Sequence, residues 1–289
     1  MTYHVLYNPR AGSGNGEAEA RNLDDLLKKD TLIYHDITAM GSYADFFGKL
    51  DPAQSVILAG GDGTINRFLN ATQDLEIPND ILYYAVGSGN DFLHDVGKER
   101  GAAPFSIKEY LKDLPTVTVK GKRYRFLNGI GYGIDGYCCE AGDRQREKSN
   151  KPVNYTAIAI KGLLFHYKPV NAEVTVDGKK YSFKKVWLAP TMNGRYYGGG
   201  MKVAPDQDRL NKEKTVSLSM YYGAGKLKAL MVFPSIFKGE HIKHTEMTKV
   251  ISGHEITVKF DKPTALQIDG ETILAVTEYS VSAGVPARV

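Results

Sequence analysis

One glycine-rich turn combines features of a phosphate site with a carboxylate: Gly60-Gly61-Asp62-Gly63-Thr64. Apolar residues 56–59 before it predict a buried strand, and the apolar spacing of residues 64–71 predicts a helix. Glycines between a strand and a helix let backbone N–H groups approach an anion, which the helix dipole also favours. A carboxylate among phosphates makes sense when Mg²⁺ lies between them, so Asp62 predicts a Mg-nucleotide site. An ordinary strand–turn–helix corner is the alternative, because Gly-Asp-Gly is common in turns.

Two more turns of small and polar residues follow predicted strands. Asn8-Pro9-Arg10-Ala11-Gly12 follows residues 3–7, and Gly87-Ser88-Gly89-Asn90-Asp91-Phe92 follows residues 81–86. Turns at the carboxyl ends of strands in an α/β domain line one crevice, so we expect all three turns at one site. Capping of a helix over 91–96 is the alternative for Asn90 and Asp91.

The elements that must position these turns change in kind along the chain. Strands at 3–7, 32–37, 56–59 and 81–86 alternate with helices, one predicted over 17–29 and another capped by Ser42. After Lys112 short strands prevail, Asp177-Gly178 and Asp269-Gly270 signal hairpins, and helical segments lie near 154–165 and 226–237. The pattern predicts an α/β domain followed, from about Gly121, by a mostly antiparallel β domain.

Composition narrows the class of protein. The 289 residues carry a net charge of +4, which is mild for a nucleic-acid binder but permits contact with an anionic surface. The only cysteines, Cys138 and Cys139, are adjacent, so they build no disulfide framework or metal cluster, as in a reducing cytosol. We expect no signal peptide and no membrane span, because the longest apolar segment, 155–167, contains Lys161 and His166. Any membrane contact is expected to be peripheral, at the cytoplasmic face.

Five motifs in order resemble the diacylglycerol kinase catalytic-domain family, whose bacterial members are soluble lipid kinases. They are the three turns above, Gly198-Gly199-Gly200-Met201 with Pro205-Asp206, and Asp269-Gly270-Glu271. The resemblance spans nearly the whole chain. It implies a three-layer α/β nucleotide domain of the kind NAD kinases share (residues 1–120, joined by a tail of about 281–289). It also implies an antiparallel β-sandwich lipid-substrate domain (121–280).

The family's activity implies ATP- and Mg²⁺-dependent phosphorylation of a lipid hydroxyl, with conversion of diacylglycerol to phosphatidic acid as the expected reaction. Asp62 would serve Mg²⁺ and catalysis, Glu271 would be the general base with Asp269 beside it, and Asp206 would bind a further ion. The residues implied in nucleotide binding are Asn8, Pro9, Gly12, Gly60, Gly61, Gly63, Thr64, Gly87, Ser88, Asn90 and Asp91. Glu271 can also be an ordinary exposed acid of a hairpin.

Three positions depart from the family's pattern. Arg67 stands where many members have Glu, Thr118 where some have a functional Asp, and Asn211-Lys212-Glu213 where an Asp-Asp-Gly usually forms part of a structural Mg²⁺ site. Two alternatives therefore stay open. One is a kinase of another acceptor, a sphingoid lipid or NAD, since NAD kinases and phosphofructokinases share Gly-Gly-Asp-Gly. The other is a catalytically silent nucleotide- or lipid-binding module.

Residues 226–238 combine lysines with large apolar side chains. Such a segment can lie on a membrane surface, or it can be a core-packed helix with solvated lysines. The expected partner is a lipid substrate at the membrane surface, with no nucleic acid. A homodimer is left open.

Overall fold

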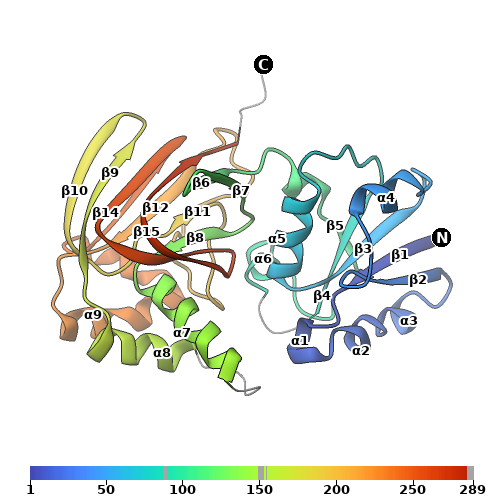
Figure 1. The fold of residues 1–289 in the computed structure, drawn as a ribbon, viewed down its shortest axis with the longest axis horizontal. Coiled ribbons are helices and arrows are strands. Elements are labelled where there is room, and N and C mark those ends of the chain that lie inside the picture. Colours follow the sequence, from blue (N-terminus) through green and yellow to red (C-terminus); the bar gives the residue numbers. More distant parts are fainter. Residues whose placement is uncertain (87–89, 149–152, 154, 285–289) are drawn as a thin grey trace. The chain divides into compact units, whose positions relative to one another are not determined.

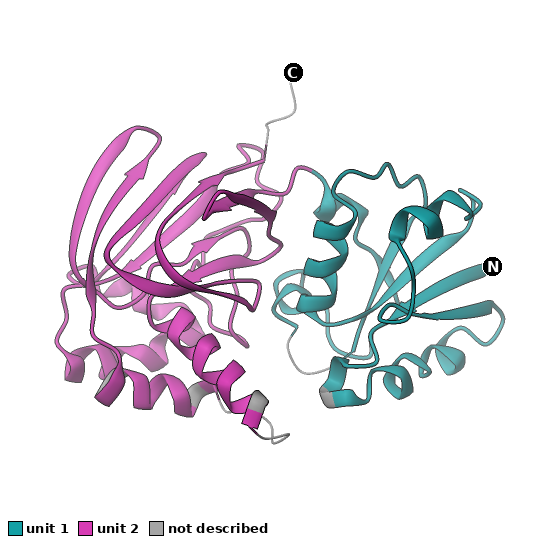
Figure 2. Ribbon diagram, viewed as in Figure 1, with its two compact units in different colours: residues 1–112 teal, residues 113–289 magenta. Residues whose placement is uncertain are grey.

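The computed structural model describes residues 1–86, 90–148, 153 and 155–284. The chain divides into two compact units, Met1–Lys112 and Asp113–Val289 (Figure 2). Each unit is described by itself.

Unit 1 is built on a five-stranded sheet in the order β2-β1-β3-β4-β5 (Figure 1). The first four strands pair in parallel, and the short β5 pairs antiparallel to β4. Residues 56–59 of β3 are fully buried, as expected for a parallel strand covered on both faces. The strands are β1 (Thr2–Tyr7), β2 (Thr31–Asp36), β3 (Ser55–Gly60), β4 (Ile81–Ala85) and β5 (Phe105–Ser106).

Helices cover both faces of this sheet. On one face, Leu23 of a covering helix packs with Ile57 of the sheet. On the other face, two covering helices contact each other through Phe47 and Phe68 (Figure 1). The predicted helix over 17–29 is broken into α2 and α3, because the amides of Asn22 and Asp24 bond three residues back. The helices are α1 (Ala11–Gly14), α2 (Gly16–Ala20), α3 (Leu23–Leu26), α4 (Tyr43–Gly48), α5 (Asp62–Ala71), α6 (Asp91–Asp95) and the 3₁₀ turn η1 (Lys108–Leu111). The predicted cap of α4 is confirmed, since Ser42 Oγ accepts the Asp45 N–H at 3.0 Å.

Unit 2 is built on a ten-stranded sheet whose pairings are all antiparallel. The order is β13-β12-β11-β8-β14-β15-β6-β7, and β9 joins β10 to β14. The strands are β6 (Thr116–Val119), β7 (Lys122–Arg125), β8 (Gly129–Tyr132), β9 (Val170–Val176), β10 (Lys179–Val186), β11 (Thr191–Met192), β12 (Val216–Tyr221), β13 (Thr248–Gly253), β14 (Glu255–Ile268) and β15 (Glu271–Ser282). The register of β14 with β15 shifts between Lys259 and Leu266.

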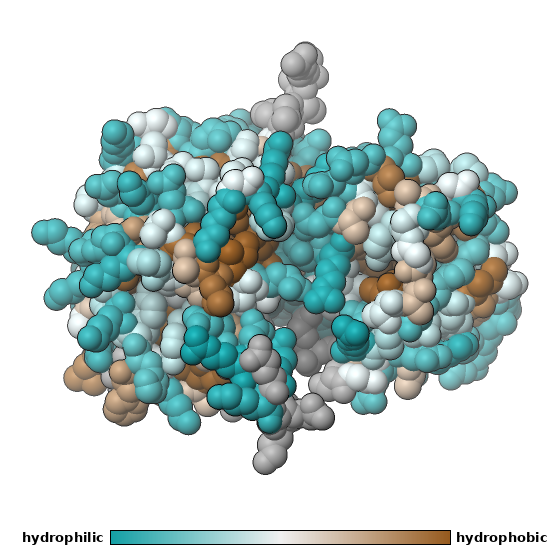
Figure 3. All heavy atoms as spheres, viewed as in Figure 1, coloured by the Kyte–Doolittle hydropathy of each residue, from teal (hydrophilic) through white to brown (hydrophobic). Residues whose placement is uncertain are grey.

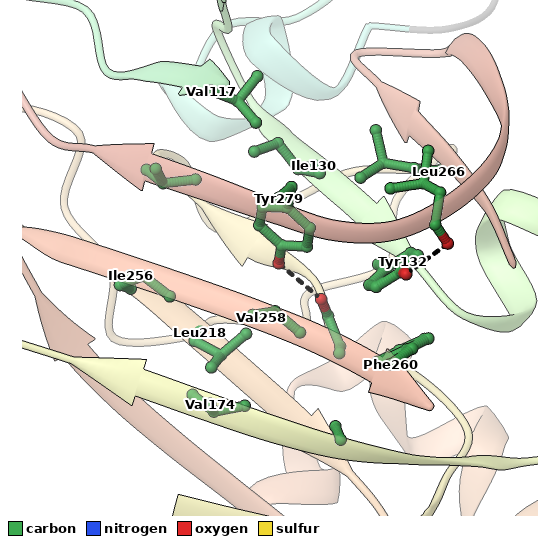
Figure 4. Close-up of a cluster of buried hydrophobic side chains, with 14 of the residues drawn as sticks. Val117, Ile130, Tyr132, Val174, Leu218, Ile256, Val258, Phe260, Leu266 and Tyr279 are labelled. Atoms are coloured by element: carbon green, nitrogen blue, oxygen red, sulfur yellow. Dashed lines mark hydrogen bonds between the residues drawn. The ribbon is translucent and has the colours of Figure 1, made fainter. Parts of the chain in front are cut away.

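That irregularity lets β14 pair with β9 along one stretch and with β8 along another, so the strands surround one core. Figure 4 shows side chains from β6, β8, β9, β12, β14 and β15 meeting there. Tyr132 stacks on Phe260 with ring centroids 3.7 Å apart, and the hydroxyls of Tyr279 and Thr191 are hydrogen-bonded at 2.8 Å. The predicted fold class, an α/β domain followed by an antiparallel β domain, is confirmed.

Helices of unit 2 form a second core against the sheet, around Trp187, Val203, Phe233 and Ile236. They are α7 (Ile134–Lys148), α8 (Tyr155–Lys161), the π-helical turn η2 (Gly162–His166), α9 (Lys226–Val232) and the 3₁₀ turns η3 (Phe233–Lys238) and η4 (Glu240–Lys243). The sequence pattern did not predict α7, β8 or β13, and most residues of α7 are polar. No helix in the described part of the chain is long and apolar enough to cross a membrane.

The division between the units falls eight residues before the predicted end of the first domain at residue 120. Residues 113–120 lie in unit 2 because β6 pairs with β7 and β15. The predicted return of the tail, about 281–289, to the first domain stays a prediction. Val281 and Ser282 pair with Val117 and Thr116 of unit 2, and residues 285–289 lie outside the described residues.

Candidate active site

The central glycine turn lies where β3 passes into α5. The helix begins at Asp62, two residues earlier than predicted, so Asp62, Gly63 and Thr64 form its first turn after an extended Gly61. A Cβ on Gly60 would lie 2.4 Å from the Thr64 side chain, so only glycine fits where strand and helix meet so closely. The first N–H groups of a helix have no intrahelical acceptor and are suited to an anion.

The first predicted turn is tied to this one. The buried Asn8 donates from Nδ2 to Thr64 Oγ1 at 3.2 Å, and its Oδ1 accepts the Arg10 N–H at 3.0 Å. The next residue, Pro9, accepts the Gly16 N–H through its carbonyl, and Gly12 has the left-handed φ of +57°. At Gly16, which the sequence analysis did not single out, a Cβ would lie 1.9 Å from the Asn8 carbonyl oxygen.

Asp62 ties the third turn to the second. Its carboxylate accepts the Asp91 N–H at 2.7 Å and the Phe92 N–H at 3.3 Å, at the start of α6. Asn90 contributes no side-chain cap to that helix, contrary to the capping alternative. Instead its Oδ1 lies 3.1 Å from the Tyr83 hydroxyl, which is also 2.9 Å from the Gly60 carbonyl oxygen. Gly87 and Ser88 lie outside the described residues.

Tyr83 is a site residue that the sequence analysis missed. Its buried hydroxyl joins the second turn to the third, and burial, together with the nearby Asp62 carboxylate, raises its pKa well above the usual value. The hydroxyl therefore stays a hydrogen-bond donor throughout the physiological range. A tyrosine inside a buried strand was the available signal, because its hydroxyl needs a partner there.

The residues of these turns fit a magnesium nucleotide. Mg²⁺ carried by phosphates takes most of its ligands from phosphate and water oxygens and needs only one or two carboxylates. A carboxylate has about four lone-pair positions, so Asp62 can serve such an ion while it accepts the two amides of α6. Arg67, the departure on α5, has an exposed side chain.

In unit 2 the Asp-Gly-Glu motif forms the hairpin turn between β14 and β15. Asp269 and Gly270 have φ of +45° and +95°, the left-handed pair of a type I′ turn, and Asp177-Gly178 forms the second predicted hairpin in the same way. The Asp269 carboxylate accepts three backbone N–H groups: Leu127 at 2.6 Å, Asn128 at 2.8 Å and Gly129 at 3.0 Å. Asp269 thus anchors the start of β8, a structural role that the sequence did not indicate.

Glu271 begins β15 on this anchored turn. Its side chain is exposed, and the residues around it are held: Gly270 N–H donates to the buried Gln267 at 2.7 Å, and Thr272 Oγ1 donates to Asp143 of α7 at 2.7 Å. Exposure alone also suits an ordinary hairpin acid. The hydrogen bonds of Asp269, Gly270 and Thr272 hold the residues on both sides of Glu271. They therefore give Glu271 the fixed backbone that a proton acceptor needs.

The metal site at Asp206 stays a prediction. Asp206 is exposed, and in the described ranges no three His, Cys, Asp or Glu residues are grouped to hold a metal ion. Amide side chains close this loop. Gln207 Nε2 donates to the Thr215 carbonyl at 2.9 Å, while Asn211 Oδ1 accepts the Thr215 N–H at 3.0 Å and its Nδ2 donates to the Asp208 carbonyl at 2.6 Å.

A buried carboxyl in unit 2 was also missed. Asp135 lies in the first turn of α7, and its Oδ2 accepts the Tyr197 hydroxyl at 2.8 Å. Burial raises the pKa of Asp135 to about 6, although the Tyr197 hydrogen bond acts the other way. Tyr197 directly precedes the predicted motif Gly198-Gly199-Gly200-Met201, whose three glycines all have positive φ and turn the chain so that Tyr197 pairs with Met201.

Comparison with known proteins agrees with this architecture. The diacylglycerol kinase catalytic domain matches residues 2–117, and the YegS C-terminal NAD kinase beta sandwich-like domain matches residues 128–287. A diacylglycerol kinase of Bacillus subtilis is 27% identical over 282 residues, covering 92% of this chain and 88% of that protein. A diacylglycerol kinase of Mycobacterium tuberculosis is 27% identical over 202 residues, which are 67% of this chain.

The chain matches 63% of the length of the Mycobacterium tuberculosis protein. The crystal structure of a diacylglycerol kinase from Bacillus anthracis has the same fold, with a TM-score of 0.61 at 18% identity over 98% of this chain and 94% of that one. The two domains occur here in succession, and the second covers more than half of the chain. The chain therefore belongs to the diacylglycerol kinase family of phosphotransferases.

Proposed function

We propose that this protein is an ATP- and Mg²⁺-dependent lipid kinase that phosphorylates the hydroxyl of diacylglycerol to give phosphatidic acid. The observation that carries the proposal is that side-chain hydrogen bonds connect the three glycine-containing turns of unit 1 to one another. Asn8 joins the first turn to the second, and Asp62 joins the second to the third. A corner that only reverses the chain needs no such cross-linking.

The turns of unit 1 would hold the nucleotide. Backbone N–H groups at the start of α5 and the N–H of Gly12 would donate to phosphate oxygens, since the other amides of the Asn8–Gly12 turn bond within the protein, and Asp62 would be the ligand for Mg²⁺. Bound Mg²⁺ supplies neutralisation of the charge on the transferred group. Phosphoryl transfer depends mainly on positioning and on such neutralisation, so few side chains need to take part directly.

Glu271 would act on the acceptor. The lipid hydroxyl oxygen forms a bond to the γ-phosphorus, the bond from that phosphorus to the β,γ-bridging oxygen breaks, and ADP leaves. Glu271 takes the hydroxyl proton, which requires an accessible carboxylate within hydrogen-bond reach of the hydroxyl. Asp269 serves as the positioning residue, since it fixes the turn through three backbone amides.

The decisive assay is transfer of labelled γ-phosphate from ATP to total membrane lipid, followed by identification of the product. Labelled phosphatidic acid is expected. A labelled sphingoid lipid, or transfer to NAD in a parallel reaction, would assign another acceptor. Nucleotide binding by calorimetry with no labelled product would favour the silent module, which Arg67 and Thr118 keep open.

Glu271→Gln tests the acceptor half of the proposal. We expect phosphate transfer to fall by at least about a hundredfold, because the proton acceptor is lost. Stability should be unchanged, since the side chain is exposed. Glu278→Gln, an exposed acid on the same strand, is the matched control and should keep full activity. Wild-type turnover in Glu271→Gln would remove the assignment.

A further inference from the structure

Exposed apolar side chains gather on the helices of unit 2. Phe165 of η2 is 73% exposed, and Leu227 and Met231 of α9 are 71% and 67% exposed. Leu227 and Met231 are four residues apart and so share one face of α9, while Ala229 and Val232 are buried. The turn η2 packs beside α9. We call these three residues the helical apolar patch; Figure 3 shows tan to brown atoms along the edge of unit 2 where Figure 1 places α8 and α9.

The helix α9 has features of both a core-packed helix and a membrane-surface segment, the two interpretations that its sequence allowed. One face packs into the core, as in an ordinary surface helix. The exposed side of α9 carries the large apolar side chains of Leu227 and Met231 beside Lys226 and Lys228, whereas an ordinary surface helix is polar there. Three such exposed side chains lie on two elements that pack together, whereas exposed apolar residues elsewhere on a protein are normally single.

The two segments that form the patch carry charge of one sign. Residues 155–168 and 225–239 contain no Asp or Glu, and they carry five lysines: Lys161, Lys168, Lys226, Lys228 and Lys238. These five exceed the net charge of +4 of the whole chain, so all other residues together carry a net charge of −1. Several acids of neighbouring segments form ion pairs: Glu246 pairs with Lys228 at 2.8 Å and Glu240 with Lys243 at 3.0 Å. On α7, which packs against α8 and η2, Glu140 pairs with Arg144 and Asp143 with Arg146.

We infer that the helical apolar patch docks on the surface of an anionic lipid bilayer. Phe165, Leu227 and Met231 enter the boundary between headgroups and acyl chains, and the surrounding lysines contact anionic headgroups. A second copy of the chain fits this surface poorly, because a two-fold contact would set lysines against lysines. The inference deepens the proposed function, on which it rests for the need to reach a lipid substrate.

The test is sedimentation with vesicles in the absence of nucleotide. Wild-type protein is expected to bind vesicles of equal parts phosphatidylglycerol and phosphatidylcholine, and to be released by high salt, but not to bind pure phosphatidylcholine. The apolar variant is Phe165→Ser/Leu227→Ser/Met231→Ser, and the charge variant is Lys161→Glu/Lys226→Glu/Lys238→Glu. Each should weaken binding at least about tenfold, with circular dichroism and thermal unfolding as checks on folding.

Matched controls change the same chemistry elsewhere. Leu26→Ser/Val250→Ser removes exposed apolar side chains outside the patch, and Lys28→Glu/Lys122→Glu/Lys180→Glu makes the same change of net charge on other surfaces. Both should bind anionic vesicles like the wild type. Equal loss in the controls, or wild-type binding by both patch variants, would overturn the inference.

Failure of docking and failure of the kinase proposal give different results. A wild-type protein that binds anionic vesicles but phosphorylates no lipid keeps the docking inference and loses the proposed activity. One that phosphorylates a short-chain diacylglycerol in solution but binds no vesicles does the reverse. Sedimentation velocity without vesicles tests the remaining occupant: a wild-type dimer that the apolar variant converts to monomer would assign the patch to self-association and refute the docking inference.

Discussion

Asp62 in unit 1 and Asp269 in unit 2 both use their carboxylates to accept backbone N–H groups of a distant segment, but in different numbers. Asp62 accepts two backbone amides at the start of α6, and Asp269 accepts three at the start of β8. Asp62 lies in a helix's first turn among the phosphate-type turns, whereas Asp269 lies within a hairpin beside an exposed Glu271. An acid in a family motif can therefore be an anchor that positions its neighbour as well as a participant in the reaction.

The largest effect expected from this comparison is on catalysis through Asp62. Asp62→Asn removes the charge that would hold Mg²⁺ but keeps one oxygen for the α6 amides. Phosphate transfer should fall at least about a hundredfold, while the free energy of unfolding should fall by only about 1 kcal/mol. Kinetic assays and urea unfolding of the same preparation measure both. A large stability loss with normal turnover of the folded fraction would make Asp62 an anchor only.

Asp269→Ala should show the opposite pattern. It leaves three backbone N–H groups without the charged acceptor to which they donate. We therefore expect the free energy of unfolding to drop by about 3–5 kcal/mol. Asp269→Asn, which keeps one acceptor oxygen, should lose less and retain measurable turnover of its folded fraction. Urea unfolding ranks the three proteins. An Asp269→Ala protein as stable as the wild type would contradict the anchoring role.

Asp135 predicts a dependence of stability on pH. Its folded pKa of about 6 lies above the ordinary 3.8 because burial disfavours the charged form. A raised carboxyl pKa stabilises the fold below about pH 4, and that contribution is lost as the pH rises through 6. The loss amounts to roughly 3 kcal/mol. Asp135→Asn should remove this slope between about pH 4 and about pH 6 in urea unfolding, whereas the exposed Asp206→Asn should keep it.

The smallest effect concerns the loop around Asp206, where the family resemblance implied a metal site and where amide side chains form the hydrogen bonds seen. Asn211→Ala removes bonds to Thr215 and Asp208 and should cost about 1–2 kcal/mol in urea unfolding. A chelator should leave the unfolding temperature of the nucleotide-free protein unchanged. A lower unfolding temperature with chelator, restored by Mg²⁺, would show that an ion holds the loop after all.

Local signals were enough for much of the fold. Runs of apolar residues located the four parallel strands of unit 1, glycines located the turns after β1 and β3, Ser42 located a helix start, and two Asp-Gly pairs located hairpins. These features depend on the backbone preferences of a few adjacent residues, so a short stretch of sequence is enough to predict them. Helix α7 was missed for the same reason, because its mostly polar residues show no apolar period and only packing in unit 2 makes it a helix.

The sequence by itself determined which residues could do chemistry: the Asp62 turn, the two turns of matching character, and Glu271. Only the tertiary structure decided how they are used. It joined Asn8 to Thr64 and Asp62 to Asp91 across 56 and 29 residues of chain, made Asp269 an anchor, and closed the Asp206 loop with amides. Bonds between distant segments depend on which strands the topology sets side by side, and no local preference of residues carries that information.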